Sequence, residues 1–249
     1  MKNCTCVWNI PCSPLPLPDD EVHVWWASLE TTALLEKTLA QTLSADEQAR
    51  AAKFHFDKDR KHFVVARGLL RMLLGQYLGI KANQIEFSYG SQGKPALAPC
   101  DREPTLSFNL SHSQDHVLYA FTQNRQIGID LEYIRRLPDI ETIVEHFFSA
   151  REHSVFQTLS PSQKIIAFFS TWTCKEAVLK AIGEGLAQPM DQIEVSLDLS
   201  ESVRLLSIED DPKLSAQWSL YRLQPVPDYS ATLAVRGQGW HLKCWQFTE

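Results

Sequence analysis

The stretch Ile127-Gly128-Ile129-Asp130-Leu131-Glu132 combines strand-forming residues with two acidic side chains. Successive side chains of a strand point to opposite faces, so Ile129 and Leu131 are predicted to enter a core while Asp130 and Glu132 lie together. Two adjacent carboxylates repel each other, and burying them unpaired costs free energy. A divalent cation removes that cost, and hard oxygen ligands favour magnesium. A solvated strand face is the alternative, because Arg135 follows closely.

A second acidic residue pattern lies in Trp172-Thr173-Cys174-Lys175-Glu176-Ala177-Val178-Leu179-Lys180. On a helix, Trp172, Glu176 and Lys180 fall on one face. The flanking residues are strongly apolar, so this helix is predicted to be largely buried, and its charges then need a function. Glu176 could be a third metal ligand or a proton acceptor, and Lys180 could bind a phosphate. An ordinary Glu–Lys pair on a solvated helix is the alternative.

Two further segments suit an anionic ligand. The first is Phe108-Asn109-Leu110-Ser111-His112-Ser113, in which a strand ends in small polar residues and an imidazole that can face an anion. The second is Gln92-Gly93-Lys94-Pro95, where glycine permits close backbone approach and lysine supplies charge. Each is also a common turn. The sequence contains no G-x-S-x-G elbow, Walker A loop or G-x-G-x-x-G, which argues against serine-hydrolase, nucleoside-triphosphate and dinucleotide sites.

Arginines are spaced along one predicted helix. Arg60, Arg67 and Arg71 form a single stripe on a helix expected over about 59–78, and Arg50 lies on the preceding helix. A solvated helix face is the favoured interpretation for Arg71. Arg50 has a reason to face a ligand only if the neighbouring segments form a pocket.

The order of predicted elements suggests a duplicated α+β arrangement, with an N-terminal half over 1–122 and a C-terminal half over 127–249. A capping box at Ser44 and Glu47 starts a helix, and another begins at Ser149. Further helices are expected over 139–147, 149–158 and 161–182. Strands are expected over 22–26, 85–89, 105–110, 117–121, 127–134, 192–197, 202–208, 216–223, 230–235 and 240–246, with residues 111–113 connecting two of them.

Composition limits the function classes. The chain has 249 residues, 44% of them hydrophobic, and a formal net charge of -6. This balance argues against a nucleic-acid or membrane-surface binder. No apolar run approaches the roughly 20 residues of a membrane span, and no signal peptide is predicted. Of the six cysteines, Cys4, Cys6 and Cys12 lack the second ligand pair of a zinc site. A soluble, reduced, cytoplasmic protein is therefore expected.

The four segments occur in one order: residues 92–95, 108–113, 127–132 and 172–180. This combination resembles the Sfp-type 4′-phosphopantetheinyl transferases, and most closely their cyanobacterial members. The resemblance runs from about Ser44 to Gly185. It implies two similar α/β halves related by a pseudo-twofold, with coenzyme A in the cleft between them. It also implies transfer of the phosphopantetheine arm to a serine of an acyl or peptidyl carrier protein, with release of adenosine 3′,5′-bisphosphate.

The resemblance further implies roles for individual residues. Asp130, Glu132 and Glu176 would bind Mg²⁺, and Glu176 would also accept the proton of the carrier serine. Lys180 would hold the pyrophosphate of coenzyme A. The remaining expected ligand contacts are Arg50 and His112 at the 3′-phosphate, and Lys94, Pro95 and the backbone of Asn109, Leu110 and Ser111 at the nucleotide. One departure is Glu47, where some members carry a lysine, so the 3′-phosphate site is expected to have fewer cations or to borrow Arg60.

Two other functions remain open from the sequence. A non-catalytic coenzyme A or nucleotide-binding module would keep Arg50, Lys94 and His112 but would need no acidic residues. A metal-dependent phosphohydrolase would release phosphopantetheine without a carrier. The sequence does not distinguish fatty-acid, polyketide and peptide carriers, and a monomer is the simplest expectation for two halves in one chain.

Overall fold

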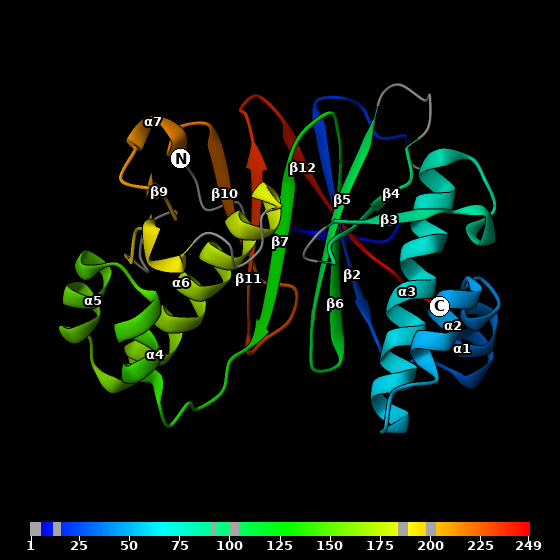
Figure 1. The fold of residues 1–249 in the computed structure, drawn as a ribbon, viewed down its shortest axis with the longest axis horizontal. Coiled ribbons are helices and arrows are strands. Elements are labelled where there is room, and N and C mark those ends of the chain that lie inside the picture. The colour runs from blue at the N-terminus through cyan, green and yellow to red at the C-terminus, as the bar shows by residue number, and fades with distance from the viewer. Residues whose placement is uncertain (1–5, 12–15, 91–92, 100–104, 184–188, 198–202) are drawn as a thin grey trace.

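Two helices of 22 residues each dominate the computed structural model, α3 (Asp57–Leu78) and α6 (Pro161–Ile182). Figure 1 shows two sheets side by side in the middle of the molecule, with α3 and α6 on opposite outer sides. The fold is thus a mixed α+β arrangement with one long helix in each half. The structure describes residues 6–11, 16–90, 93–99, 105–183, 189–197 and 203–249.

The first half is built on a sheet with strand order β1-β12-β2-β6-β5. β2, β6 and β5 are antiparallel neighbours, whereas β12 runs parallel to both β1 and β2. The chain therefore returns at its last strand to the sheet of the first half. The strands are β1 (Trp8–Asn9), β2 (Glu21–Ser28), β5 (Leu106–Ser113), β6 (His116–Gln123) and β12 (His241–Gln246).

One face of this sheet packs against α3. Leu69, Leu70 and Leu74 from α3 and Tyr119 and Phe121 from β6 are fully buried in one cluster. Two shorter helices, a 3-10 turn and a two-stranded hairpin complete the half. They are α1 (Ala33–Ala40), α2 (Ala45–Ala51), η1 (Ala82–Gln84), β3 (Phe87–Tyr89) and β4 (Pro95–Leu97).

The second half is built on a sheet with strand order β10-β11-β7, which packs on α6. Ala177 and Val178 of α6 and Ala234 of β11 lie in one buried cluster. The second half comprises β7 (Ile127–Tyr133), α4 (Ile140–Phe147), α5 (Ala150–Gln157), η3 (Met190–Gln192), β8 (Ile193–Val195), β9 (Leu205–Ile208), α7 (Pro212–Ser215), β10 (Trp218–Leu223) and β11 (Tyr229–Arg236).

Most predicted elements are confirmed, including both capping boxes and α6 at its predicted bounds. One connection was predicted wrongly: residues 111–113 do not link two strands but continue β5. The turn to β6 lies instead at Gln114 and Asp115, where Gln114 has a φ of 48°. The division of the chain between 122 and 127 stays a prediction, and β12 shows that the halves share a sheet.

Cysteine pairing differs from the expectation of reduced thiols. Cys6 and Cys244 form a disulfide across a sequence separation of 238 residues. The parallel pairing of β1 with β12 brings them together, because Trp8 is the partner of Cys244 in the ladder. Cys174 is a buried free thiol, and Cys4, Cys12 and Cys100 lie outside the described residues.

Within the described part of the chain, no helix is both long and apolar enough to cross a membrane.

Candidate active site

Asp130 lies at the junction of the two halves, on the edge strand β7. Its side chain is 5% exposed, and its Oδ1 accepts hydrogen bonds from Lys180 Nζ at 2.6 Å and from Ser111 Oγ at 2.9 Å. Ile129 and Leu131 are buried in the core, as strand alternation predicted. Glu132, two residues on, is half-buried and accepts from Ser113 Oγ at 3.2 Å. The two carboxylates therefore share one face of β7.

Glu176 faces the same region from α6. Burial raises its pKa, and the negative charge of Asp130 raises it further. The pKa of Glu132 is raised by burial first and by Asp130 second. The three carboxylates thus repel one another where β7 packs against α6. In the part of the chain that the structure describes, the ligand atoms of these three carboxylates are spread over more than 4.8 Å.

Lys180 brings positive charge to these carboxylates, and Lys94 contacts the backbone of Lys180. Lys180 lies one helical turn after Glu176 and also donates to Ser111 Oγ at 3.0 Å. Lys94 crosses from the first half and donates to the backbone carbonyl of Lys180. Burial lowers the pKa of Lys94, and the charge of Lys180 lowers it further. The structure therefore brings Lys94 of the first half into contact with α6 at Lys180.

The donor set suits a divalent cation. Asp130 Oδ2 is a buried oxygen that lacks a hydrogen-bond partner among the described residues. An unpaired buried carboxylate oxygen is costly, and a cation would satisfy it. Glu132 and Glu176 add carboxylate oxygens, the ligand type that magnesium prefers. Both side chains have raised pKa values, and the charge of Asp130 contributes to each shift. The residues present therefore fit the metal predicted from the sequence.

The residues predicted at the 3′-phosphate lie on separate elements, Arg50 on α2 and His112 on β5. Arg50 is exposed in the last turn of α2, with its guanidinium carbon 5.3 Å from the ring centre of Phe63. The pKa of His112 is lowered by burial and then by the positive charges of Lys180 and His62. Arg60 pairs with Asp57 at 3.4 Å and with Glu36 at 3.9 Å, so its charge is already shared with two carboxylates.

Glu47 has a role that the sequence did not reveal. It is 2% exposed, and its carboxylate lies 2.6 Å from Arg71 Nε and 3.4 Å from Arg67 Nε. Arg71 also donates to the carbonyls of Ala82 and Ile85. The interpretation of Arg71 as part of a solvated face was therefore wrong. Glu47 is therefore the counterion of two buried arginines, rather than a position at which a phosphate-binding cation has been lost.

The polar residues of β5 contact β7 through their side chains. Asn109 Oδ1 accepts from the backbone N–H of Ile129 at 2.8 Å, and Ser111 Oγ accepts from that of Leu131 at 3.2 Å. Their side-chain oxygens are therefore engaged in contacts between the two sheets. The turn interpretation of this motif is corrected accordingly. Whether Pro95, at the start of β4, lines a nucleotide site stays a prediction.

Lys175, inside the helical motif, is fully buried. Its Nζ lies 2.6 Å from Glu152 and donates to the carbonyls of Met190 and Ile193. The ion pair ties α6 to α5, and the two hydrogen bonds tie α6 to η3 and to the start of β8. In the sequence, Glu152 was recognised only as the third residue of the α5 capping box, where its Oε2 accepts from Ser149 N. Its Oε1 accepts from Val195 N at 2.8 Å.

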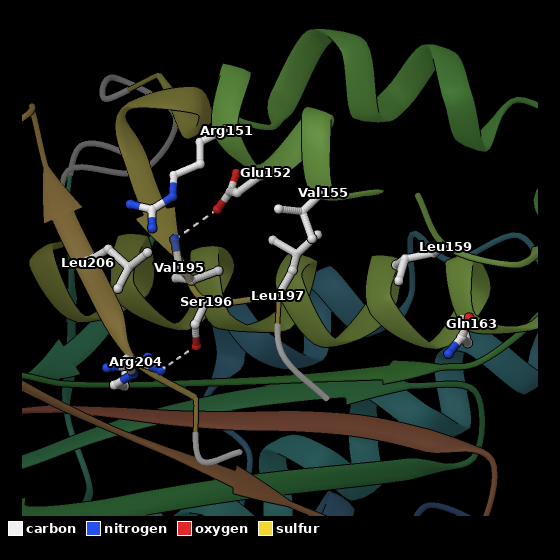
Figure 2. A pocket seen from close by; sticks show the side chains of 10 residues that line it. All are labelled: Arg151, Glu152, Val155, Leu159, Gln163, Val195, Ser196, Leu197, Arg204 and Leu206. Carbon is white, nitrogen blue, oxygen red and sulfur yellow. Dashed lines mark hydrogen bonds between the residues drawn. The ribbon is translucent and has the colours of Figure 1, made fainter. Parts of the chain in front are cut away.

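Two other features lie outside the predicted site. Glu30, His62 and Asp115 place one ligand atom each within 4.8 Å, and Lys58 pairs with Asp115 at 2.8 Å. A cavity of about 510 Å³ lies among α5, α6, β8 and β9, and Figure 2 shows Val155, Leu197 and Leu206 on its apolar wall. None of the predicted site residues lines this cavity.

The fold and the site together define a class of protein: an α+β chain of two halves with carboxylates and lysines at their junction. Comparison with known proteins is more specific. A family model described as the 4′-phosphopantetheinyl transferase superfamily matches residues 126–234. A model described as the N-terminal region of 4′-phosphopantetheinyl transferase matches residues 26–124. The chain belongs to the 4′-phosphopantetheinyl transferase superfamily.

Individual relatives agree with this assignment. The 4′-phosphopantetheinyl transferase HetI of Nostoc sp. is 43% identical over 233 residues, which cover 94% of this chain and 95% of the relative. A relative from Synechocystis sp. is 32% identical over 151 residues, 61% of each chain. The 4′-phosphopantetheinyl transferase of Bacillus subtilis is 29% identical over 162 residues, 65% of this chain and 70% of the relative. The family predicted from the sequence is confirmed, and so is the predicted similarity to its cyanobacterial members.

Proposed function

We propose that this chain transfers the 4′-phosphopantetheine arm of coenzyme A to a serine of an acyl or peptidyl carrier protein, releasing adenosine 3′,5′-bisphosphate. The observation that carries the proposal is the meeting of Asp130, Glu176 and Lys180 at the junction of two halves that both match this family. A module that only binds coenzyme A has no need of mutually repelling carboxylates beside its phosphate-binding lysines.

Asp130, Glu132 and Glu176 would hold Mg²⁺ in the working enzyme. Bound there, the ion would neutralise charge on the pyrophosphate of coenzyme A. The unpaired Oδ2 of Asp130 and the raised pKa values of both glutamates support this assignment. The protein's own part is to hold Asp130 and Glu132 on one face of β7 and to present Glu176 to them from α6.

Glu176 would act as the general base. Its raised pKa brings the carboxylate nearer to the operating pH, which favours proton transfer from a serine hydroxyl. In the step proposed, the serine Oγ bonds to the phosphorus that carries pantetheine, while its proton moves to Glu176. The bond from that phosphorus to the bridging oxygen breaks, and the leaving adenosine bisphosphate keeps the electron pair.

Basic residues around the carboxylates would bind the rest of coenzyme A. Lys180 would contact the pyrophosphate, since its ammonium already lies beside Asp130. Arg50 and His112 would face the 3′-phosphate, and an arriving anion would raise the lowered pKa of His112 and charge it. Lys94, Pro95 and the backbone of 109–111 would line the nucleotide.

We also propose a cytoplasmic monomer that uses coenzyme A and a carrier domain and has no nucleic-acid partner. The two halves share a sheet through β12, so one chain can supply both sides of the site. Size-exclusion chromatography with light scattering measures the oligomeric state directly.

The decisive experiment is intact mass spectrometry of several apo carrier proteins incubated with the chain, coenzyme A and MgCl₂. One added phosphopantetheine per carrier supports the proposal, and relative rates rank the carriers. Asp130→Ala and Glu176→Ala should abolish the mass gain while the protein stays folded. Full activity in excess chelator would refute the metal site, and release of free phosphopantetheine without carrier would indicate a hydrolase instead.

A further inference from the structure

Strands β5 and β7 face each other as edges of two different sheets. Side chains, and not a backbone ladder, connect the edges: Asn109, Ser111 and Ser113 accept hydrogen bonds from the backbone N–H groups of residues 129, 131 and 133. The spacing of two on both strands means that each polar side chain meets one amide. Asp130 and Glu132 are the β7 residues that lie between these amides.

The hydrogen-bond partners fix the direction of each serine proton. Ser113 Oγ accepts from the N–H of Tyr133 at 3.1 Å, and it lies 3.2 Å from Glu132 Oε2. A backbone N–H can only donate, so the one hydroxyl proton of Ser113 is free to go to Glu132. Ser111 is constrained more tightly, because both the N–H of Leu131 and the ammonium of Lys180 donate to it, leaving its proton for Asp130.

We propose that Ser113 is a positioning residue for the metal site: its hydroxyl, oriented by Tyr133 N–H, holds the Glu132 carboxylate. Ser111 does the same for Asp130 from the neighbouring position on β5. The first half of the molecule thereby sets the orientation of ligands that the second half supplies. This inference rests on the proposed function, since it concerns how Glu132 is presented to a divalent cation.

A serine in this role affects metal affinity without contacting the substrate. Groups that hydrogen-bond to metal ligands typically change metal affinity or activity by about 10- to 100-fold when they are removed. Ser113→Ala is therefore expected to weaken metal binding within that range and to leave the KM for coenzyme A near that of the parent at saturating metal. Ser113→Thr keeps the hydroxyl and is expected to restore affinity.

The test is Mn²⁺ binding to the full chain, measured by electron paramagnetic resonance with coenzyme A present and carrier absent. The half-saturating Mg²⁺ concentration for carrier modification is the second readout. Ser107→Ala is the matched control, because Ser107 lies on β5 at the same spacing and hydrogen-bonds to no carboxylate in the described part of the chain. If Ser113→Ala does not fold, Ser113→Cys keeps the side-chain size with a weak donor and should show the same loss.

The outcomes separate this inference from the proposed function. A parent chain that binds Mn²⁺ and modifies a carrier, with Ser113→Ala matching it in metal affinity, overturns the positioning role alone. A rise in the KM for coenzyme A at saturating metal also overturns it, because Ser113 would then contact the nucleotide. A parent that neither binds metal nor modifies any carrier refutes the proposed function and this inference with it.

Discussion

Replacing Lys175 by methionine separates a structural role from a catalytic one for the lysine next to Glu176. Lys175 is fully buried, and its ammonium lies 2.6 Å from Glu152, which is 1% exposed. Burial lowers the pKa of Lys175 and raises that of Glu152, and each charge is stabilised by the other. In Lys175→Met, the Glu152 carboxylate stays buried with only the Ser149 and Val195 amides as donors.

Removing one partner of a buried ion pair typically costs about 3–5 kcal/mol, because the other charge is left uncompensated. For a chain of this size about 2–4 °C of melting temperature corresponds to each kcal/mol, so Lys175→Met should melt about 6–20 °C lower. Glu152→Gln combined with Lys175→Met removes the orphaned charge and keeps an acceptor for the amides. The double variant should therefore lose less stability than the sum of the single variants.

The measurement is urea unfolding followed by circular dichroism for both single variants and the double variant. Lys164→Met is the matched control, because Lys164 also lies on α6 and pairs with Glu141 at 2.7 Å, but that carboxylate is 52% exposed. An exposed pair contributes about 0–1 kcal/mol, so the control should change little. If Lys175→Met keeps parental stability while the KM for coenzyme A rises, the structural assignment is wrong and Lys175 contacts a phosphate.

Three further predictions concern the site. Glu176→Gln should lower carrier modification by about 100- to 10,000-fold in the mass assay without lowering the melting temperature, because a repelled charge is removed; a tenfold effect or less would exclude a general base. Arg50→Ala should raise the KM for coenzyme A about 10- to 100-fold but leave that for 3′-dephospho-coenzyme A unchanged, with Arg60→Ala as the paired control. Glu132 and Glu176 have raised pKa values, so above pH 4.5 the folded chain retains protons that the unfolded chain releases. The ligand-free protein therefore loses stability as the pH rises. MgCl₂ with coenzyme A should therefore raise the melting temperature more at about pH 7.5 than at about pH 5, and equal shifts would contradict carboxylate ligation.

Local patterns predicted the elements that carry the chemistry. Alternation along β7 placed Asp130 and Glu132 on one face, and the apolar flanks of α6 predicted a buried helix carrying Glu176 and Lys180. Both inferences depend on residues a few positions apart, and a strand or helix fixes their relative directions by its own geometry. The capping boxes were predictable for the same reason, since their hydrogen bonds span three residues.

Interactions between distant segments were not predictable in this way. Glu47 looked like a lost cation because nothing in its neighbourhood in sequence shows that Arg71, 24 residues on, is buried beside it. The Ser111–Ser113 segment looked like a turn because its partners are the amides of a strand about 20 residues later. The Cys6–Cys244 disulfide depends on a parallel pairing of the first and last strands. Each error concerns a polar side chain whose partner only the tertiary fold supplies.

Gly128 connects the two local predictions into one site. A Cβ at this position would lie 2.0 Å from the carbonyl oxygen of Ala177 and 2.5 Å from the amide nitrogen of Ala181, both in the backbone of α6. Only glycine therefore allows β7 and α6 to approach this closely. Ala177 and Ala181 directly follow Glu176 and Lys180, so the contact at Gly128 places the Glu176 carboxylate and the Lys180 ammonium near Asp130. The strand motif and the helix motif thus meet at one backbone contact. That contact explains why Gly128 stands two residues before Asp130.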